Sequence, residues 1–378
     1  MNINKYIKTF GHKTFHEMPF NEVDGLIFAE MAYINFNLVI PDNHLVKLKD
    51  IKIENKKEFY YGSVDARYNR VMIESMMKSK RYENIKIGYC IRKDDYINFQ
   101  QFFAMTIIMP THEAYIAYRG TDVSLLGWRE DFYIAFQDVF PSQLMALEYV
   151  NNVTQLFHEK FYIGGHSKGG NLAIFAAVYM DPMLQSRLLK AFSYDGPGFR
   201  QEINKLNSFK QIEDRIVKFL TSNDVIGVVY NKFKDVKIVY SRGILLGGHD
   251  PFTWSVKNGG NFYFTKERSK QSKKSEEAMM NWLTNLKDEQ KQLAIAVLFD
   301  FIGESKTIYD LLLNGARILF NGKKRLSNYP PEQINEAKDI FKQLGRYYLD
   351  AFNIRRINKK KPVEEPKRIA QKTEKKKK

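Results

Sequence analysis

Apolar residues recur along the middle of the chain in two rhythms, one typical of strands and one typical of helices. Phe102–Met109 and Ala114–Tyr118 are rich in apolar and β-favouring residues, and a turn at Pro110 separates them. Two such runs around a turn indicate an antiparallel hairpin. Beyond the hairpin, short apolar runs alternate with segments of helical spacing. This alternation predicts a mostly parallel sheet with helices on both faces, which is an α/β fold.

The individual elements follow from the same two patterns. Helices are predicted where the spacing of apolar residues is helical, over Glu22–Phe36, Ser142–Lys160 and Asn171–Met180. Strands are predicted at the short apolar runs Phe161–Ile163, Lys190–Tyr194, Arg215–Leu220 and Val236–Tyr240. The hairpin is expected at the leading side of the sheet.

The composition changes after residue 265, which suggests three regions. Lys266–Lys274 is a basic run, and helical patterns without a convincing strand follow it as far as Leu349. The last residues are mostly Lys, Arg, Glu and Pro, a composition that does not bury enough apolar surface to fold. We therefore expect an α/β domain over residues 15–265, a helical extension over 266–352 and a disordered basic tail over 353–378.

The net charge of +16 is concentrated in that tail. Arg355–Lys378 holds 12 basic and 3 acidic residues, so +9 lies there and +7 is spread over the other 354 residues. This distribution excludes a protein that wraps nucleic acid over its whole surface, and no specific nucleic-acid partner is expected. Hydrophobic residues make up 44% of the chain, enough for a sizeable core.

Cysteine usage and hydropathy bear on the compartment. Cys90 is the only cysteine in the sequence, which excludes an internal disulfide and a cysteine-based metal site. The first 20 residues lack the apolar stretch of a signal peptide, and no run is apolar enough to span a membrane. A cytoplasmic location is expected.

The segment Gly165-His166-Ser167-Lys168-Gly169 fits the pattern G-x-S-x-G. An apolar strand is predicted before it and an apolar helix after it, which is the context of a nucleophile elbow. Gly165 and Gly169 would let the strand and the helix approach closely around a strained Ser167. The alternative is a glycine-rich turn that binds phosphate, but the residues match neither GK[ST] nor G-x-G-x-x-G.

An elbow serine needs a base, and His249 is the candidate. In this architecture the acid and the histidine follow the serine in the chain, and of the seven histidines only His249 lies downstream of Ser167. It occupies a loop after the last predicted strand. His166 is adjacent to Ser167 and cannot readily fold back onto its hydroxyl, so we reject it as the base.

The orienting acid is expected to be Asp224, with Asp195 as the second candidate. Both follow a predicted strand, so both are expected at the carboxyl edge of the sheet, where ligands and catalytic loops gather. Asp195 has an alternative role in a turn of sequence DGPG. We therefore prefer Asp224.

Acyl transfer also needs donors for an oxyanion. The N–H of the residue after the nucleophile, Lys168, is one candidate. The second is the N–H of Thr121, which follows a glycine in the sequence YRGTD after the second strand of the hairpin. The loss of one such donor typically costs ~2.7–4 kcal/mol of transition-state stabilisation.

These segments together resemble the class-3-lipase-like α/β-hydrolases. The resemblance rests on YRGTD with Trp128 and Asp131, on GHSKGGN, on SNDVIG with Asp224, and on His249. GHSKGGNLA with YDGPGF is similar to a bacterial branch of that superfamily. The resemblance covers roughly residues 22–254 and implies an α/β-hydrolase catalytic domain over 15–265. It implies a Ser167–His249–Asp224 triad, with Thr121 and Lys168 as oxyanion residues.

One position departs from true lipases. Leu is usual where this chain has Lys168, so the resemblance implies a charge at the mouth of the pocket and an anionic or polar-headed ester as substrate. Val123–Trp128 and Val225–Phe233 are apolar segments beside the predicted site. They are candidates for an acyl pocket or a lid, and ordinary packing is an equal alternative.

The expected function is a serine hydrolase of lipase or esterase type that cleaves a small-molecule or lipid ester without a metal or organic cofactor. Two other readings stay open. A catalytically idle hydrolase fold would serve as a binding protein. Alternatively, the basic tail would tether the chain to an anionic membrane or RNA, since each Lys or Arg near an anionic bilayer contributes ~1 kcal/mol; a purely solubilising tail is the simpler explanation.

Overall fold

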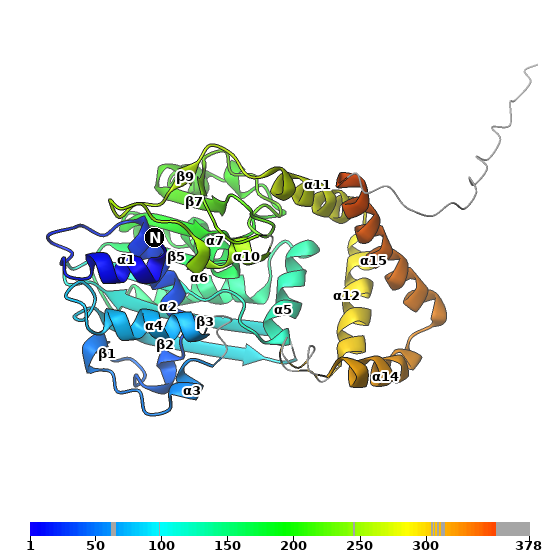
Figure 1. Cartoon of the computed structure of the whole chain (residues 1–378), viewed down its shortest axis with the longest axis horizontal. Helices are drawn as coiled ribbons and strands as arrows, with labels where there is room; N and C mark the ends of the chain where they lie inside the picture. Colours follow the sequence, from blue (N-terminus) through cyan, green and yellow to red (C-terminus); the bar gives the residue numbers. More distant parts are fainter. Residues whose placement is uncertain are drawn as a thin grey trace, which may run out of the picture.

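The structure is a computed structural model that describes residues 1–352 except 62–65, 98, 245, 304, 306, 308, 309 and 311–313. The predicted disordered tail, 353–378, lies outside the described residues. Figure 1 shows a central sheet with helices around it and a group of C-terminal helices at one end.

The described strands form one mixed sheet whose spatial order is the order of the chain, β1 to β9. The strands are β1 Leu45–Lys47, β2 Lys86–Asp95, β3 Gln100–Ile108, β4 Ala114–Tyr118, β5 Phe161–His166, β6 Leu188–Tyr194, β7 Ile216–Thr221, β8 Val236–Val239 and β9 Phe264–Thr265. Pairing is antiparallel from β1 to β4, parallel from β4 to β8 and antiparallel again between β8 and β9. The predicted hairpin is β3–β4, and the predicted parallel strands are β5 to β8.

Helices cover both faces of the sheet, and the side chains of β3 show how. Phe103 and Met105 belong to a core cluster with α1 (Ile3–Phe10), α2 (Glu22–Met31) and α4 (Ala66–Met76). The opposite face of the sheet packs against α6 (Pro141–Val153) and α7 (Lys168–Tyr179). Because both faces are buried, the strands are runs of apolar residues rather than strict alternations. The remaining short helices are α3 Lys56–Phe59, α5 Leu125–Asp131, α8 Pro182–Gln185, α9 Asn207–Lys210 and α10 Leu246–His249.

This architecture confirms the α/β-hydrolase fold predicted from the sequence. The sheet is mixed, and helices cover both of its faces. Ser167 forms the turn between β5 and α7 at the centre of the sheet. The strands β1, β2 and β9 were not predicted. Helix α1 precedes residue 15, where we placed the start of the domain, yet Ile3, Tyr6 and Ile7 are buried in the same core cluster.

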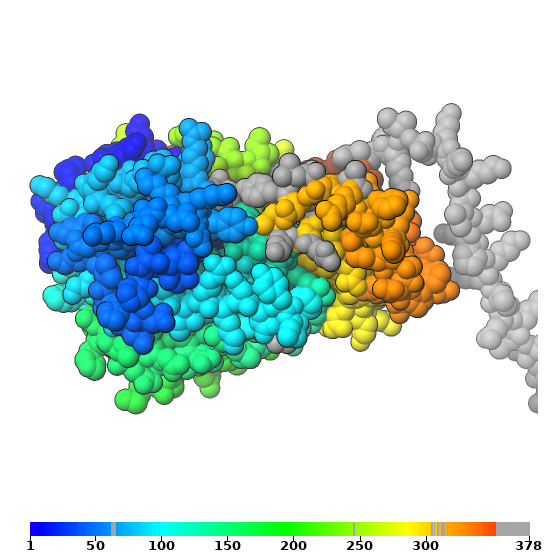
Figure 2. Space-filling model, turned by 90° about the horizontal axis from the view of Figure 1, so that it is seen from below, coloured from blue at the N-terminus to red at the C-terminus, as the bar shows by residue number. Residues whose placement is uncertain are grey.

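The C-terminal helices stand beside the sheet at one end of the molecule (Figures 1 and 2). They are α11 Lys270–Thr284, α12 Asp288–Ile302, α14 Gly315–Arg325 and α15 Pro331–Ala351. Ile295 and Phe299 of α12 pack against Leu125 of α5, which fixes this layer on the side of the sheet where α5 and α10 lie. Of the helices in the described ranges, none is both long and apolar enough to cross a membrane.

Candidate active site

Ser167 forms the sharp turn between β5 and α7. Its backbone has φ 57° and ψ −133°, a conformation that is strained for any residue with a side chain. Its N–H donates a hydrogen bond of 2.9 Å to the carbonyl oxygen of Tyr194, the last residue of the neighbouring strand β6. The side chain is half-buried. Among the described residues, the Ser167 hydroxyl has no hydrogen-bond partner and is available to react.

The two motif glycines are required by close backbone contacts. A Cβ atom at Gly165 would lie 2.4 Å from the Gly169 carbonyl carbon, and one at Gly169 would lie 2.2 Å from the Tyr118 carbonyl oxygen. Real Cβ atoms do not approach other atoms so closely. The elbow therefore packs directly against the end of β4, as the predicted role of these glycines requires.

His249 and Asp195 form a hydrogen-bonded pair next to this turn. His249 Nδ1 lies 2.7 Å from Asp195 Oδ2, and the Asp195 carboxyl is wholly buried. The Thr221 N–H donates to the other carboxylate oxygen, Oδ1, at 3.2 Å. An ionised carboxylate only accepts hydrogen bonds, so Nδ1 carries the ring proton and Nε2 keeps a free lone pair. This is the tautomer that a general base needs.

The hydrogen-bond partner of the His249 ring is thus Asp195 and not Asp224, the residue that we preferred from the sequence. Asp195 directly follows β6, the strand that pairs with β5, whereas Asp224 follows β7, one strand further away. Asp195 also has a positive φ of 52°. Asp224 Oδ1 instead accepts the N–H groups of Ile226 and Gly227, at 2.7 and 2.8 Å. Asp224 therefore holds a turn behind the pair.

Two buried ionisable groups, Asp224 and Lys218, lie near this pair and affect its charge. Burial raises the pKa of Asp195 to about 7. Burial and the neighbouring Asp195 raise the pKa of Asp224 well above its ordinary value. Lys218, whose ammonium donates to the Gly196 carbonyl, has its pKa lowered by burial to about 8. Both carboxyl groups therefore have a raised pKa, and Asp195 is the one that is hydrogen-bonded to the His249 ring.

The two expected oxyanion residues, Thr121 and Lys168, belong to segments that lie at the elbow. A Cβ at Gly120 would lie 2.5 Å from the His166 carbonyl oxygen and 3.1 Å from Ser167 Cβ, so the loop before Thr121 touches the nucleophile. Lys168 is the first residue of α7, where N–H groups lack helical partners. Within the described residues, neither the Thr121 nor the Lys168 N–H donates a hydrogen bond.

The Thr121 side chain is tied to a further acid. Its hydroxyl lies 2.6 Å from both carboxyl oxygens of Asp131, which is one of the residues on which the resemblance to lipases rests. Burial raises the pKa of Asp131 to about 6. Asp131 therefore fixes the orientation of the loop that presents the Thr121 N–H.

The Lys168 side chain is buried, so its charge does not lie at the mouth of a pocket as expected; the anionic or polar-headed ester inferred from it stays a prediction. Its ammonium is 1% exposed and lies 2.6 Å from Glu130 Oε2. Glu130 in turn accepts hydrogen bonds from the Gln101 N–H, at 3.2 Å, and the Ser142 hydroxyl, at 2.5 Å. The charge is neutralised inside the protein and does not face a ligand.

The apolar segments beside the site are covered by the C-terminal helices. Leu125 and Trp128 pack with Phe299 of α12, and Val229 and Tyr230 pack with the cluster around Trp282 of α11. These contacts pack the two segments against the C-terminal helices, and their role as an acyl pocket or a lid stays a prediction.

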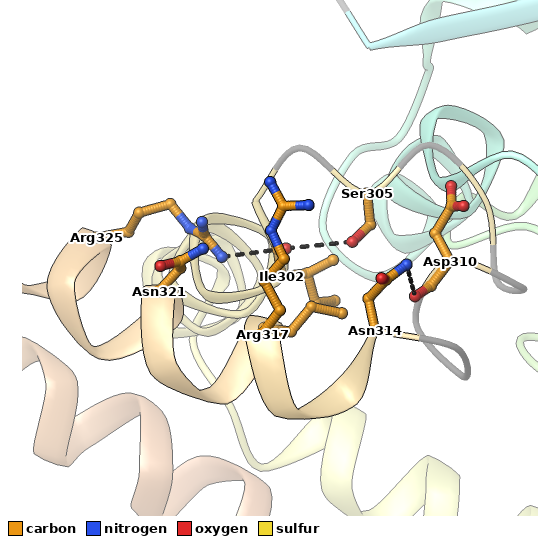
Figure 3. Close-up of a pocket in the computed structure, with 8 residues that line it drawn as sticks. Ile302, Ser305, Asp310, Asn314, Arg317, Asn321 and Arg325 are labelled. Atoms are coloured by element: carbon orange, nitrogen blue, oxygen red, sulfur yellow. Dashed lines mark hydrogen bonds between the residues drawn. The ribbon is translucent and has the colours of Figure 1, made fainter.

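A polar hollow lies elsewhere, between α12 and α14 (Figure 3). There Arg325 donates to the Ile302 carbonyl oxygen at 3.3 Å, and Asn314 donates to that of Asp310 at 3.1 Å. None of the residues that line it belongs to the group around Ser167.

Sequence reasoning missed four residues of the site. Glu130 and Lys218 are buried charges that no local pattern marks, because their partners come from distant segments. Tyr33 and His166 are in contact behind the elbow, with 3.2 Å between the Tyr33 hydroxyl and His166 Nδ1. The position of His166 next to the nucleophile was the available signal, but only its role as a base was considered.

Three comparisons place the chain among known proteins. A model of the Mbeg1-like family matches residues 76–300, more than half of the chain. A search of the curated proteins found no match. Among solved structures, a crystal structure of M37 lipase is similar at 15% sequence identity and a TM-score of 0.38, covering 56% of this chain and 70% of that one.

Proposed function

Because the chain belongs to the Mbeg1-like family and has the α/β-hydrolase fold, we propose that it is a serine hydrolase that cleaves carboxylic esters. The observation that carries this proposal is the 2.7 Å hydrogen bond between His249 and Asp195, made beside a strained serine. The resemblance to class-3-lipase-like hydrolases supports the same reaction. The proposed triad is Ser167, His249 and Asp195.

The first half of the reaction forms an acyl-enzyme. His249 Nε2 takes the proton of the Ser167 hydroxyl as its oxygen attacks the ester carbonyl carbon. The carbonyl oxygen becomes negative and is stabilised by the N–H groups of Thr121 and Lys168. Asp195 stabilises the positive imidazole through Nδ1. When the carbon–oxygen bond to the alcohol breaks, the leaving oxygen receives the proton from Nε2.

The second half returns the serine. Water enters, gives a proton to His249 Nε2 and adds its oxygen to the acyl carbon. The tetrahedral intermediate collapses, the acid leaves, and the proton passes back to Ser167. Among the described residues, no hydrogen bond joins the Ser167 hydroxyl to His249, and such bonds commonly tighten only when substrate binds. The chemistry needs no metal or organic cofactor.

The proposed substrate class is a small-molecule or lipid ester. The buried pairing of Lys168 with Glu130 removes the reason to expect an anionic head group. The other reading, an idle fold that only binds ligands, predicts no turnover. An idle site has no need for a positive-φ serine, a correctly protonated histidine and two unpaired N–H groups in one place.

The test is turnover of p-nitrophenyl esters of increasing chain length. Wild type should release p-nitrophenol with a burst, and Ser167→Ala should lower kcat/KM about 10⁴–10⁶-fold. Ser186→Ala, which changes an exposed serine of the same sheet domain, is the matched control and should keep full activity. Equal turnover by Ser167→Ala and wild type would overturn the proposal.

A further inference from the structure

His166 is buried directly beside the proposed triad and has no part in the mechanism above. It is the last residue of β5, immediately before Ser167, and its side chain is 6% exposed. Its ring stacks at a tilt on the His249 ring, with 4.5 Å between the centroids, and the edge of Trp254 packs on it at 6.3 Å. A buried polar ring in such a place needs partners for both nitrogens.

One of those nitrogens contacts the backbone of the proposed base. His166 Nε2 lies 2.9 Å from the carbonyl oxygen of His249. A carbonyl oxygen only accepts hydrogen bonds, so Nε2 carries a proton and donates it. The other nitrogen, Nδ1, lies 3.2 Å from the Tyr33 hydroxyl and 3.3 Å from Glu30 Oε1.

The direction of the bond does not depend on the charge of the ring. Burial and the adjacent His249 lower the pKa of His166 well below its ordinary value, which favours the neutral ring. In that state Nδ1 accepts from Tyr33. A charged ring would donate from Nδ1 to Glu30 instead, and Nε2 would still donate to His249.

An anchor for His249 matters because the segment that leads into it is exposed, although Gly248 and residues 251 and 252 are buried. It ends α10, a helix of four residues, and the side chains of Ile244 and Leu246 point into solvent at 77% and 60% exposure. The ring of His249 is fixed by Asp195, but its main chain is fixed by His166. Since His166 and Ser167 are consecutive, this bond ties the base to the strand that presents the nucleophile.

We propose that His166 is a positioning residue that holds His249 in place relative to Ser167 through the hydrogen bond from its Nε2–H to the His249 carbonyl oxygen. The inference rests on the proposed function, since it assigns His249 as the base. His166 touches no reacting atom. A displacement of about 1 Å in a catalytic group can cost on the order of 100-fold in rate, so the loss of this anchor should appear in kcat.

Two substitutions separate the bond from general packing. His166→Gln places an amide N–H near the position of Nε2, whereas His166→Asn is shorter and reaches only the position of Nδ1. The Asn variant should lower kcat about 10- to 100-fold at unchanged KM and slow labelling by a fluorophosphonate equally. The Gln variant should recover most of both. If His166 had only a structural role, the variants would have a lower melting temperature. The folded fraction of each variant would then have the same kcat and labelling rate as wild type.

A second measurement uses only the wild-type protein, so it does not depend on the folding of a variant. In ¹⁵N-histidine-labelled wild type at neutral pH, multiple-bond spectra should show His166 protonated at Nε2. An unprotonated Nε2, or equal kcat for wild type and a folded His166→Asn, would overturn the positioning role. If wild type itself does not react with the fluorophosphonate, the proposed hydrolase function fails, and this result is distinct from equal labelling of wild type and His166→Asn.

Discussion

At the scale of single residues, two buried carboxyl groups lie behind His249, and one of them is hydrogen-bonded to its ring. Asp195 contacts Nδ1 at 2.7 Å, while Asp224 accepts two main-chain N–H groups with one oxygen. Two adjacent carboxyl groups do not both ionise readily, so one remains neutral. Asp195, which is hydrogen-bonded to the His249 ring, is the group that ionises in the proposed mechanism. The two acids therefore differ in their contacts and in their proposed roles.

The first prediction compares amide variants of these two acids. Asp195→Asn leaves the wrong hydrogen-bonding partner at Nδ1 and should lower kcat about 10⁴-fold in a folded protein. Asp224→Asn keeps an oxygen that can accept the N–H groups of Ile226 and Gly227, makes no contact with the His249 ring and should keep most activity. Ester turnover and circular dichroism of both variants give the answer. A loss with Asp224→Asn alone would restore the original preference for Asp224.

Activity should also depend on pH through this pair. Asp195 has a pKa of about 7 and His249 a pKa below its ordinary value, and the two titrate as one coupled unit. Uptake of a proton removes the base, so kcat/KM should be constant at higher pH and fall as pH drops below about 7. A profile of kcat/KM from pH 5 to 9 tests this. Unchanged activity down to pH 5 would contradict it.

Lys218 supplies the control for that profile. Its buried ammonium lowers the pKa of Asp195, so Lys218→Met should raise that pKa and move the acidic limb of the profile to higher pH, by about one pH unit. A limb that stays in place would show that another group titrates there.

The sequence singled out Ser167 and His249, which the fold brings to one region, but it preferred Asp224, whereas the His249 ring contacts Asp195. Both aspartates follow apolar strands, and the sequence does not reveal which strand lies next to β5. It also does not show that Asp195 adopts a positive φ. Both properties belong to the assembled sheet.

At the scale of elements, the hairpin and the parallel strands were predictable, but β2 was not. Its sequence KIGYCIRKDD mixes apolar and charged positions, and it is a strand because β3 pairs along its length, with an irregularity between Gly88 and Ile91. The buried Lys168–Glu130 pair shows the same limit. It joins α7 to α5 through two residues that are 38 positions apart in the chain.

Breaking this pair should destabilise the protein, because water does not reach a charge that is left alone there. Glu130→Gln leaves an uncompensated ammonium in the interior and should lower the free energy of unfolding by about 3–5 kcal/mol. The double variant Glu130→Leu with Lys168→Met leaves no buried charge and should lose less. Urea unfolding of the single and double variants measures both values, and an equal or larger loss in the double variant would contradict this picture of the pair.

At the scale of the whole molecule, the helical layer α11 to α15 covers one side of the sheet domain, and the basic residues of 353–378 follow it in the sequence. The division at residues 265 and 352 stays a prediction, as does the tethering role of the tail. Twelve basic residues near an anionic bilayer supply ample attraction, which salt would weaken.

Removal of residues 359–378 should therefore lower binding to vesicles that contain phosphatidylserine and leave ester turnover in solution unchanged. Sedimentation with anionic vesicles at low and high salt measures the effect, and neutral phosphatidylcholine vesicles are the control. Equal binding by the full chain and the truncated chain would leave the tail as a solubilising segment.

The central claim is that Ser167 is a nucleophile activated by His249 and Asp195. Fluorophosphonate labelling of the full chain, with mass spectrometry of the labelled peptide, tests it most directly. We predict a single label on Ser167 in wild type, none in Ser167→Ala and strongly slowed labelling in folded His249→Ala and Asp195→Asn. A folded wild type that takes no label, or a label that persists in Ser167→Ala, would contradict the claim.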